Sequence, residues 1–254
     1  MNKIIKFLVR KIPRVWLIRF SYLFSWLVVP FYKGEKQHCP ICKGNFRKFL
    51  PYGNLGIDNR LCPRCLSLER HRLLWLFFER ETRLFTDKLK LLHIAPEQSF
   101  MRKFKKQKNL DYTTADLESP LADIKLDVTQ MPLENDSYDV VICNHVMEHI
   151  DDEQKAMKEI FRVLKPEGWA ILQVPLDYNR ECTYEDPSVT RPEEREAKFG
   201  QYDHVRLYGR DYKQRLEKAG FVVNSSDFVK TLGDELVEKY RLDKQELVYR
   251  CFKK

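Results

Sequence analysis

Short runs of consecutive apolar residues alternate with amphipathic stretches from residue 89 to residue 254. Apolar runs of this length predict buried strands, and apolar positions three or four residues apart predict helices. The predicted strands cover residues 90–95, 111–116, 122–128, 137–146, 169–175, 221–228 and 246–253. The predicted helices cover residues 99–107, 151–165 and 211–220, with a polar helical stretch before the last strand. The alternation predicts an α/β fold, a doubly wound and mostly parallel seven-stranded sheet with a late antiparallel strand.

The N-terminal segment is apolar and basic at once. Its longest uninterrupted apolar run, residues 20–29, is too short for a membrane-spanning helix, which needs about 20 residues. A cleaved signal is a poor interpretation, because Pro30 follows the run and no small-residue cleavage site does. We expect one or two amphipathic helices, since Lys3, Lys6 and Arg10 recur at helical spacing. They would contact either an anionic membrane surface through residues 1–32 or the rest of the protein.

Four cysteines form two C-x-x-C pairs, "CPIC" and "CPRC", separated by residues 43–61. Each pair offers two thiolates from one tight turn, so four sulfurs can surround a zinc ion tetrahedrally. Two disulfides or a redox dithiol would use the same residues, but this spacing with proline in each turn favours structural zinc. The predicted ligands are Cys39, Cys42, Cys62 and Cys65.

The helix predicted after the second pair carries His71. This histidine could replace a cysteine as ligand or contact an anion. Four cysteines already complete a zinc site, so we expect a surface or packing residue instead. Two further cysteines, Cys143 and Cys251, lie in apolar strands and read as buried thiols, which indicates a reducing cytoplasm.

The 254 residues carry a net charge of +8, with 43% hydrophobic and 32% charged residues. This composition is typical of a soluble globular protein and argues against predominant disorder. The excess of positive charge favours anionic partners such as nucleic acid, acidic lipid or phosphorylated metabolites, without selecting one of them.

Residues 131–175 contain the motifs P-L-x-x-x-S-Y-D-x-V and R-V-L-K-P-E-G. They resemble the core of the class I S-adenosylmethionine-dependent methyltransferases, in the bacterial ubiquinone-biosynthesis-like group called methyltransferase type 11. The resemblance covers residues 89–175 and implies an enzyme that transfers a methyl group from S-adenosylmethionine. The cysteine module resembles, in spacing alone, the zinc ribbon of some rRNA guanine methyltransferases.

These patterns divide the chain into four expected parts. Basic amphipathic helices occupy residues 1–36, a zinc-ribbon-like module residues 37–68, and a linking helix residues 69–88. The methyltransferase domain follows over residues 89–254, with a lid or substrate insertion at 175–209.

The resemblance assigns cofactor roles to residues at the predicted strand ends. Asp116, with Leu117 beside it, corresponds to the acid that binds the ribose hydroxyls. Asp127 and Val128 correspond to the pair that meets the adenine. Asn144, followed by His145, corresponds to the position beneath the methionine part of the cofactor and beside the transferred methyl.

The first cofactor motif departs from the family. Where relatives have an acid and then glycines, this chain has His93, Ala95, Glu97 and Ser99. Glycine permits close approach of a ligand to the backbone, so Ala95 and Pro96 must reshape the pocket. Two interpretations remain: Glu97 supplies a carboxylate for the cofactor's ammonium group, or the pocket no longer binds the cofactor. The other cofactor positions are intact, so we expect a working pocket.

Methyl transfer requires alignment of the acceptor and removal of its proton. The candidate catalytic residues are His145, His149 and His204, with Glu148 and Asp203 as further candidate bases. The candidate substrate-binding residues are Tyr202, Asp203 and Arg206, of which Arg206 is expected to hold an anionic group.

Three functions remain open. The first is a methyltransferase that acts on a small molecule or on a glycan or lipid intermediate, cytoplasmic or peripheral at the inner face of the membrane. The second is an RNA methyltransferase whose zinc ribbon and arginines bind phosphates in a salt-dependent manner. The third is a non-catalytic binding module, which predicts no cofactor affinity.

Overall fold

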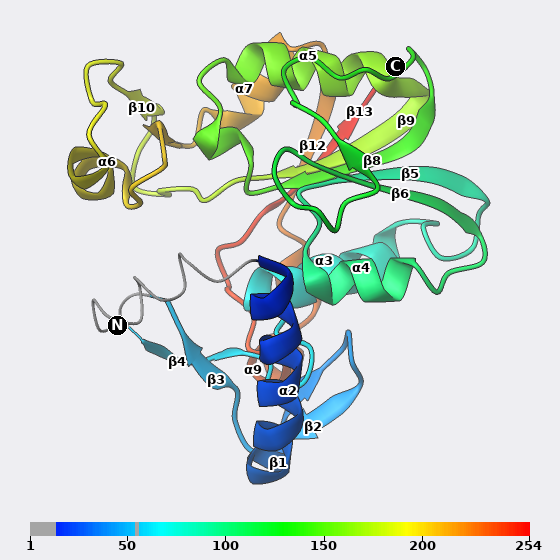
Figure 1. Ribbon diagram of the computed structural model, residues 1–254, viewed down its shortest axis with the longest axis vertical. Helices are drawn as coiled ribbons and strands as arrows, with labels where there is room; N and C mark the ends of the chain where they lie inside the picture. Colours follow the sequence, from blue (N-terminus) through cyan, green and yellow to red (C-terminus); the bar gives the residue numbers. More distant parts are fainter. Residues whose placement is uncertain (1–13, 54–55) are drawn as a thin grey trace.

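The computed structural model describes residues 14–53 and 56–254 (Figure 1). A seven-stranded sheet forms the centre, in the order β12-β13-β9-β8-β5-β6-β7. Its strands are β5 (Leu89–Ile94), β6 (Leu110–Asp116), β7 (Ile124–Lys125), β8 (Tyr138–Asn144), β9 (Leu164–Gln173), β12 (Val222–Ser226) and β13 (Val248–Phe252). β13 runs antiparallel to both neighbours, β9 and β12, and the other pairs are parallel. The predicted fold class, including the late antiparallel strand, is confirmed.

Alternate residues of the central strands enter two separate hydrophobic cores. Leu92, Val141 and Cys143 face one core, whereas Leu91 and Val140 face the other. This alternation follows from the two-residue period of a strand, because a sheet covered on both faces needs apolar side chains at every position. Figure 1 shows the covering layers. The helices α5 (Glu153–Val163) and α7 (Tyr212–Lys218) lie on one face, and α3 (Glu69–Glu81) and α4 (Gln98–Phe104) lie on the other.

Gly168 lies in β9 and shows why a glycine stands in the motif R-V-L-K-P-E-G. A Cβ atom at Gly168 would lie 2.8 Å from the carbonyl oxygen of Lys165 and 3.0 Å from that of Asp139. Such contacts are shorter than side chains tolerate, so only glycine fits. Helix α5 ends at Val163, and β9 begins at Leu164 and pairs with β8.

Residues 33–68, in the N-terminal part of the chain, form a cysteine module. Its strands are β1 (Lys33–Cys39), β2 (Gly44–Phe46), β3 (Leu50–Tyr52) and β4 (Ile57–Leu61), paired as two antiparallel hairpins. The helix α2 (Arg14–Tyr32) precedes the module and lies along it. Ser25 attaches α2 to the second cysteine turn, because its hydroxyl donates to the carbonyls of Pro63 and Arg64 at 2.6 and 2.9 Å. Our expectation for the basic positions of residues 3–12 lies outside the described residues.

The cysteine module and the sheet domain share one core rather than meeting through a linker. Phe46 and Phe49 of the module belong to the same buried cluster as Phe100 of α4. Arg72 of α3 is fully buried and donates to the carbonyls of Ser67 and Arg60 on the module side. It also donates to the carbonyls of residues 240 and 241, which end α9 (Asp234–Tyr240). One guanidinium thus joins the two halves, and α3 is a core element.

The remaining elements lie around the carboxyl end of the sheet. A 3-10 helix, η1 (Met147–His149), follows β8. The insertion after β9 contains β10 (Tyr184–Glu185), α6 (Pro192–Phe199) and β11 (Arg206–Leu207), and β10 pairs with β11. Helix α8 (Phe228–Thr231) follows β12. None of the helices in the described part of the chain combines the length and apolar character needed to cross a bilayer.

Candidate functional site

The candidate site begins where β5 and β8 end side by side. The chain adds β6 and β7 on one side of β5, and later adds β8 and β9 on the other side. The strand order therefore reverses between β5 and β8. Ligands of doubly wound sheets bind at such a switch point. Residues 95–97 follow β5 there, and residues 144–145 end β8.

Ala95 adopts the left-handed conformation that glycine would adopt in this turn, with φ of 49°. Its N–H donates to the carbonyl of Ala115 in β6 at 2.8 Å, which holds the turn against the sheet. A non-glycine residue in this region costs about 1–2 kcal/mol. The turn therefore keeps the backbone shape of a glycine turn at the expense of local strain, and such strain is concentrated at functional sites.

Glu97 lies at the centre of a hydrogen-bond network. Its Oε2 lies 2.6 Å from Nε2 of His93, and its Oε1 accepts from Nδ2 of Asn144 at 3.0 Å. Nδ1 of His93 lies 2.9 Å from the hydroxyl of Tyr112. An ionised carboxylate can only accept, so Nε2 of His93 carries the proton, and Nδ1 of a neutral ring then accepts from Tyr112.

Burial alone would raise the pKa of Glu97, but the hydrogen bonds that its carboxylate accepts from His93 and Asn144 act in the opposite direction, and the pKa is lowered to about 2. His71 lies 3.9 Å from the same carboxylate. Burial lowers the pKa of His71 to about 3, so this ring is neutral at pH 7. The hydrogen bonds from His93 and Asn144, rather than a charge on His71, therefore keep Glu97 ionised.

His71 is a packing residue and not a surface residue or a metal ligand. Its Nδ1 accepts from the N–H of Leu68 at 3.1 Å, and its ring meets Phe100 edge-on. Sequence reasoning missed both His71 and Tyr112 as neighbours of Glu97. Neither belongs to a recognisable motif, and only the packing of α3 and the pairing of β5 with β6 bring them to the site.

Asp116 ends β6, and Asp127 follows β7 by two residues. Oδ1 of Asp116 accepts from the N–H groups of Glu118 and Ser119 at 2.9 and 2.7 Å, which leaves Oδ2 outside this turn. Oδ1 of Asp127 accepts from the N–H and hydroxyl of Thr129, and these bonds lower its pKa. Leu117 is 54% exposed, whereas Val128 is buried. In both acids the local turn uses Oδ1, and Oδ2 takes no part in the hydrogen bonds of that turn.

His145 follows β8 in a left-handed conformation, with φ of 54°. Its N–H donates to the carbonyl of Gln173 at 2.7 Å. Its Nδ1 lies 3.3 Å from Oε1 of Glu148, which is 2% exposed. His145 Nε2 has no hydrogen-bond partner among the described residues, although it is buried. The ring is therefore oriented by Glu148 and has one nitrogen to spare.

The insertion brings His204 against η1. The rings of His149 and His204 meet edge-on with centroids 4.8 Å apart. Nδ1 of His204 lies 3.2 Å from the carbonyl oxygen of Phe199, and burial lowers the pKa of the ring. Nδ1 of His149 lies 3.2 Å from the carbonyl oxygen of Asp203. The structure thus gathers the three candidate catalytic histidines around Glu148, while Tyr202 is 51% exposed on the same loop.

Arg206 contradicts the expected contact with an anionic substrate. Its guanidinium is 2% exposed and donates to the carbonyls of Met147, Ile150 and Asp151 at 2.5 to 2.9 Å. It also lies 3.6 Å from the buried carboxylate of Glu153. Because the insertion folds onto η1, the N–H groups of Arg206 bind the backbone of the turn that carries Glu148 and His149. Arg206 is thus a positioning residue.

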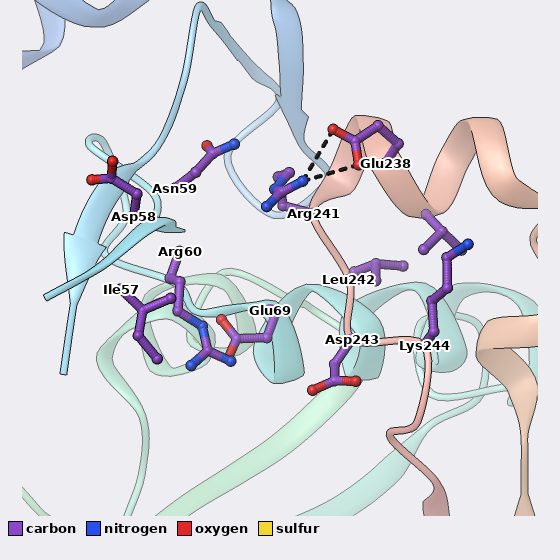
Figure 2. Close-up of a pocket in the computed structure, with 11 residues that line it drawn as sticks. Ile57, Asp58, Asn59, Arg60, Glu69, Glu238, Arg241, Leu242, Asp243 and Lys244 are labelled. Atoms are coloured by element: carbon purple, nitrogen blue, oxygen red, sulfur yellow. Dashed lines mark hydrogen bonds and ion pairs between the residues drawn. The ribbon is translucent and has the colours of Figure 1, made fainter. Parts of the chain in front are cut away.

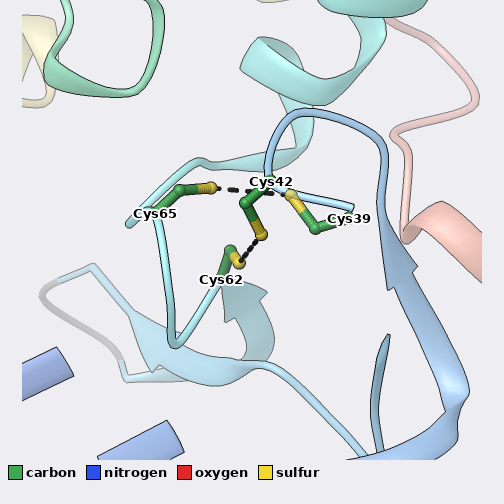
Figure 3. A group of neighbouring side chains, drawn as sticks. All are labelled: Cys39, Cys42, Cys62 and Cys65. Carbon is green, nitrogen blue, oxygen red and sulfur yellow. Dashed lines mark hydrogen bonds between the residues drawn. The ribbon is translucent and has the colours of Figure 1, made fainter. Parts of the chain in front are cut away.

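Four sulfur atoms converge in the cysteine module (Figure 3). Sγ of Cys39 lies 3.5 Å from Sγ of Cys65, and Sγ of Cys42 lies 3.7 Å from Sγ of Cys62. A disulfide would bring the sulfurs to about 2.05 Å, whereas a zinc tetrahedron with 2.3 Å bonds separates them by about 3.8 Å. The two distances fit a zinc tetrahedron and are too long for disulfides.

Unpartnered polar atoms mark the end of the sheet as a place for a polar ligand. Oγ of Ser99, Oδ1 of Asn144 and Nε2 of His145 are buried, and none has a hydrogen-bond partner among residues 14–53 and 56–254. Leaving such atoms unpaired costs free energy, so they fit a ligand that pairs with them.

A separate pocket of about 480 Å³ lies between β4, α3 and α9, and Arg60, Glu69 and Arg241 are among the residues that line it (Figure 2). That pocket touches none of the strand-end residues.

Residues 90–172 match the family described as "Methyltransferase domain". No curated protein sequence matches the chain. Among solved structures, an S-adenosylmethionine-dependent methyltransferase from Mesorhizobium loti is 15% identical with a TM-score of 0.47, covering 71% of this chain and 97% of that chain. A 1,6-didemethyltoxoflavin-N1-methyltransferase from Burkholderia thailandensis, with bound S-adenosylhomocysteine, is 13% identical with a TM-score of 0.47, covering 71% and 76%. The [4+2]-cyclase SpnF is 14% identical with a TM-score of 0.49, covering 84% and 89%.

Proposed function

We propose that this chain, whose residues 90–172 match the methyltransferase domain family, is a class I S-adenosylmethionine-dependent methyltransferase that methylates a lipid-linked acceptor at an anionic membrane surface. The exposed apolar face of α2 is the observation that supports a lipid-linked acceptor. Trp16, Phe20, Leu23, Phe24, Trp26, Leu27 and Phe31 are each at least half exposed. A helix with this many exposed aromatic and aliphatic side chains favours the boundary between headgroups and acyl chains.

Basic residues border this face. A pocket of about 600 Å³ is lined by Trp26 of α2 together with Lys33, Arg64 and Arg102. Aromatic rings beside cations are the combination that binds anionic lipid surfaces, since the rings enter the interface while the cations meet the headgroups. A protein held at the bilayer encounters lipid-linked acceptors at high local concentration. This supports a lipid intermediate over a freely diffusing small molecule.

The strand-end residues would hold the cofactor. Asp116 would accept from the ribose hydroxyls through Oδ2, and Asp127 with Val128 would meet the adenine. The carboxylate of Glu97 keeps unused lone pairs for an ammonium group, since His93 and Asn144 take one position on each oxygen. Oδ1 of Asn144 would pair with the methionine part. When bound, the cofactor supplies a methyl group on a positively charged sulfur.

His145 would take up the proton of the acceptor's nucleophile. Its Nδ1 faces the carboxylate of Glu148, so the neutral ring presents a lone pair at Nε2. The left-handed backbone at residue 145 holds the ring at the end of β8, next to Asn144. His149 of η1 borders the same edge, as do His204, Tyr202 and Asp203 of the insertion, and these side chains would face the acceptor.

Zinc at Cys39, Cys42, Cys62 and Cys65 would be structural. Four thiolates complete a tetrahedron, which leaves no position for a substrate. Cys39 and Cys62 are fully buried within the core that the module shares with α3 and α4. Zinc would therefore stabilise the helix that carries His71 toward Glu97.

The test combines flotation with vesicles and methyl transfer by the full chain. We expect binding to vesicles of phosphatidylglycerol but not of phosphatidylcholine, and transfer of label from S-adenosylmethionine to the lipid fraction of a membrane extract. Trp26→Glu should weaken vesicle binding about tenfold, because a buried Trp side chain contributes more than 1 kcal/mol. Val222→Glu alters another exposed apolar residue, on the edge strand β12, and should leave binding unchanged. Equal binding of both variants would contradict the proposal.

RNA is the second candidate, favoured by a basic groove. A pocket of about 310 Å³ between the cysteine turns and α4 is lined by Arg64, Arg102, Lys103 and Lys106. Phosphate contacts by these cations would make binding fall steeply with salt. Fluorescence anisotropy with single-stranded RNA at several salt concentrations separates the candidates. Tight, salt-dependent RNA binding without vesicle binding would favour the RNA methyltransferase.

A further inference from the structure

A second cluster of metal-binding side chains lies apart from the cysteines. Glu148 and His149 come from η1, and His204 comes from the insertion more than fifty residues later. Their ligand atoms all lie within 4.8 Å of one another. Two of the three, Glu148 and His204, are buried, so they have given up hydration to lie there, which costs free energy unless a partner replaces the water.

The inward atoms of this cluster lack partners. Glu148 is 2% exposed and His204 is 4% exposed. Oε2 of Glu148 and Nε2 of His204 are buried, and neither has a hydrogen-bond partner within the described part of the chain. An unpaired buried acceptor costs about 1–3 kcal/mol. A cation between them would satisfy both at once.

The outward atoms are already oriented as metal ligands require. Nδ1 of His204 faces the carbonyl of Phe199, and Nδ1 of His149 faces the carbonyl of Asp203, each at 3.2 Å. A histidine that donates one ring N–H to a carbonyl presents the lone pair of its other nitrogen. Oε1 of Glu148 is likewise held by His145. All three side chains therefore have supporting contacts and a free donor atom.

The backbone around the cluster is rigid. Arg206 binds the carbonyls of Met147, Ile150 and Asp151, which enclose Glu148 and His149. The N–H of Val205 donates to the carbonyl of Glu148 at 2.9 Å. The insertion and η1 are thus joined through the two residues that directly follow His204. This explains why a buried arginine is placed beside the histidines.

We propose that Glu148, His149 and His204 bind one divalent transition-metal ion, separate from the zinc of the four cysteines. Two imidazoles and one carboxylate suit zinc, iron or manganese better than magnesium or calcium, which prefer oxygen ligands. Zinc bonds of about 2.0–2.1 Å hold tetrahedral ligands about 3.4 Å apart, so the ligand atoms, now within 4.8 Å of one another, would approach by up to about 1.4 Å on binding. Three protein ligands leave a coordination position open for an oxygen of the acceptor.

The test adds Co²⁺ to the full chain after its cysteines have been loaded with zinc. We expect one further metal equivalent, with visible d–d absorption and without the near-ultraviolet band of cobalt thiolate. His149→Ala removes a partly exposed ligand, so the fold should survive, and it should weaken cobalt binding at least about tenfold. His204→Ala should do the same. His38→Ala is the control, because it removes a histidine of β1 in the cysteine module and should not change cobalt binding.

The outcomes separate this proposal from methyltransferase activity, since metal binding is measured without cofactor or acceptor. A cobalt thiolate band would mean exchange at the cysteines and would overturn a second site. Absence of d–d absorption, or equal binding by wild type, His149→Ala and His204→Ala, would overturn it as well. Retained zinc at one equivalent in all variants verifies that the cysteine site stays intact.

Discussion

Nε2 of His93 lies 2.6 Å from Oε2 of Glu97, across the turn that ends β5. The two side chains hold the turn that related sequences build from an acid and glycines. The network extends to Tyr112 and Asn144, so residues of three adjacent strands fix one carboxylate. A divergent first motif therefore still presents a single ionised acid at the switch point of the sheet.

Glu97→Gln should lower cofactor affinity by about 10- to 100-fold. A hydrogen bond to a charged group contributes about 1.5–3 kcal/mol, and glutamine keeps the shape while removing the charge. Calorimetric titration with S-adenosylmethionine and S-adenosylhomocysteine measures this change, and Asp116→Ala should lose affinity too. Glu118→Gln removes an exposed carboxylate two residues from Asp116 and should bind normally. A folded wild type without cofactor affinity would leave the non-catalytic module as the better hypothesis.

Ala95→Gly should stabilise the protein by about 0.5–1 kcal/mol. Glycine adopts a φ of 49° without steric cost, which more than offsets the greater backbone entropy of its unfolded state. Ala95→Val should destabilise, because β-branched side chains rarely adopt this conformation. Urea unfolding measures both. Ala115→Gly, in the neighbouring strand, should destabilise by about 1 kcal/mol, and a stabilising effect there would contradict the strain argument.

His71→Gln should make the free energy of unfolding decrease less steeply as the pH falls. The folded pKa of His71 is about 3, below its unfolded value of 6.5, so the unfolded state binds more protons between these values. Stability therefore falls as pH falls from 6.5 toward 3, by up to about 1.4 kcal/mol per pH unit from this group. Urea unfolding at pH 7, 5.5 and 4.5 should show a shallower decline for the variant. Parallel curves would mean that His71 is solvated in the folded protein.

Cys62→Ser should release zinc and lower the melting temperature of the whole protein in one transition. Cys62 is fully buried in the core that continues through α3 and α4 into the sheet, so the module cannot melt alone. Metal analysis and thermal unfolding check this. Cys182→Ser alters an exposed thiol and should change neither. Two separated transitions would show that the module folds independently.

Arg206→Lys should destabilise the fold by about 3 kcal/mol without weakening cofactor binding. Lysine cannot reproduce the fork that donates to three carbonyls, and it leaves Glu153 with a poorer partner. Arg210→Lys, with an exposed side chain, should be neutral. A variant of normal stability with impaired transfer would restore the substrate contact expected from the sequence.

The order of strands and helices after residue 89, the four cysteines and the strand-end acids could be predicted from the sequence, because they depend on local periodicity and fixed spacing. The buried role of Arg206 could not be predicted, since an arginine in the expected insertion favours contact with an anionic substrate and only the packing of the insertion on η1 buries it. The same holds for the joint core of the module and the sheet, which rests on contacts between Arg72 and residues about 170 positions later. Local sequence determined which residues end each strand, and the tertiary structure alone decided which of them meet, because side chains from distant segments come together only when the whole sheet is packed.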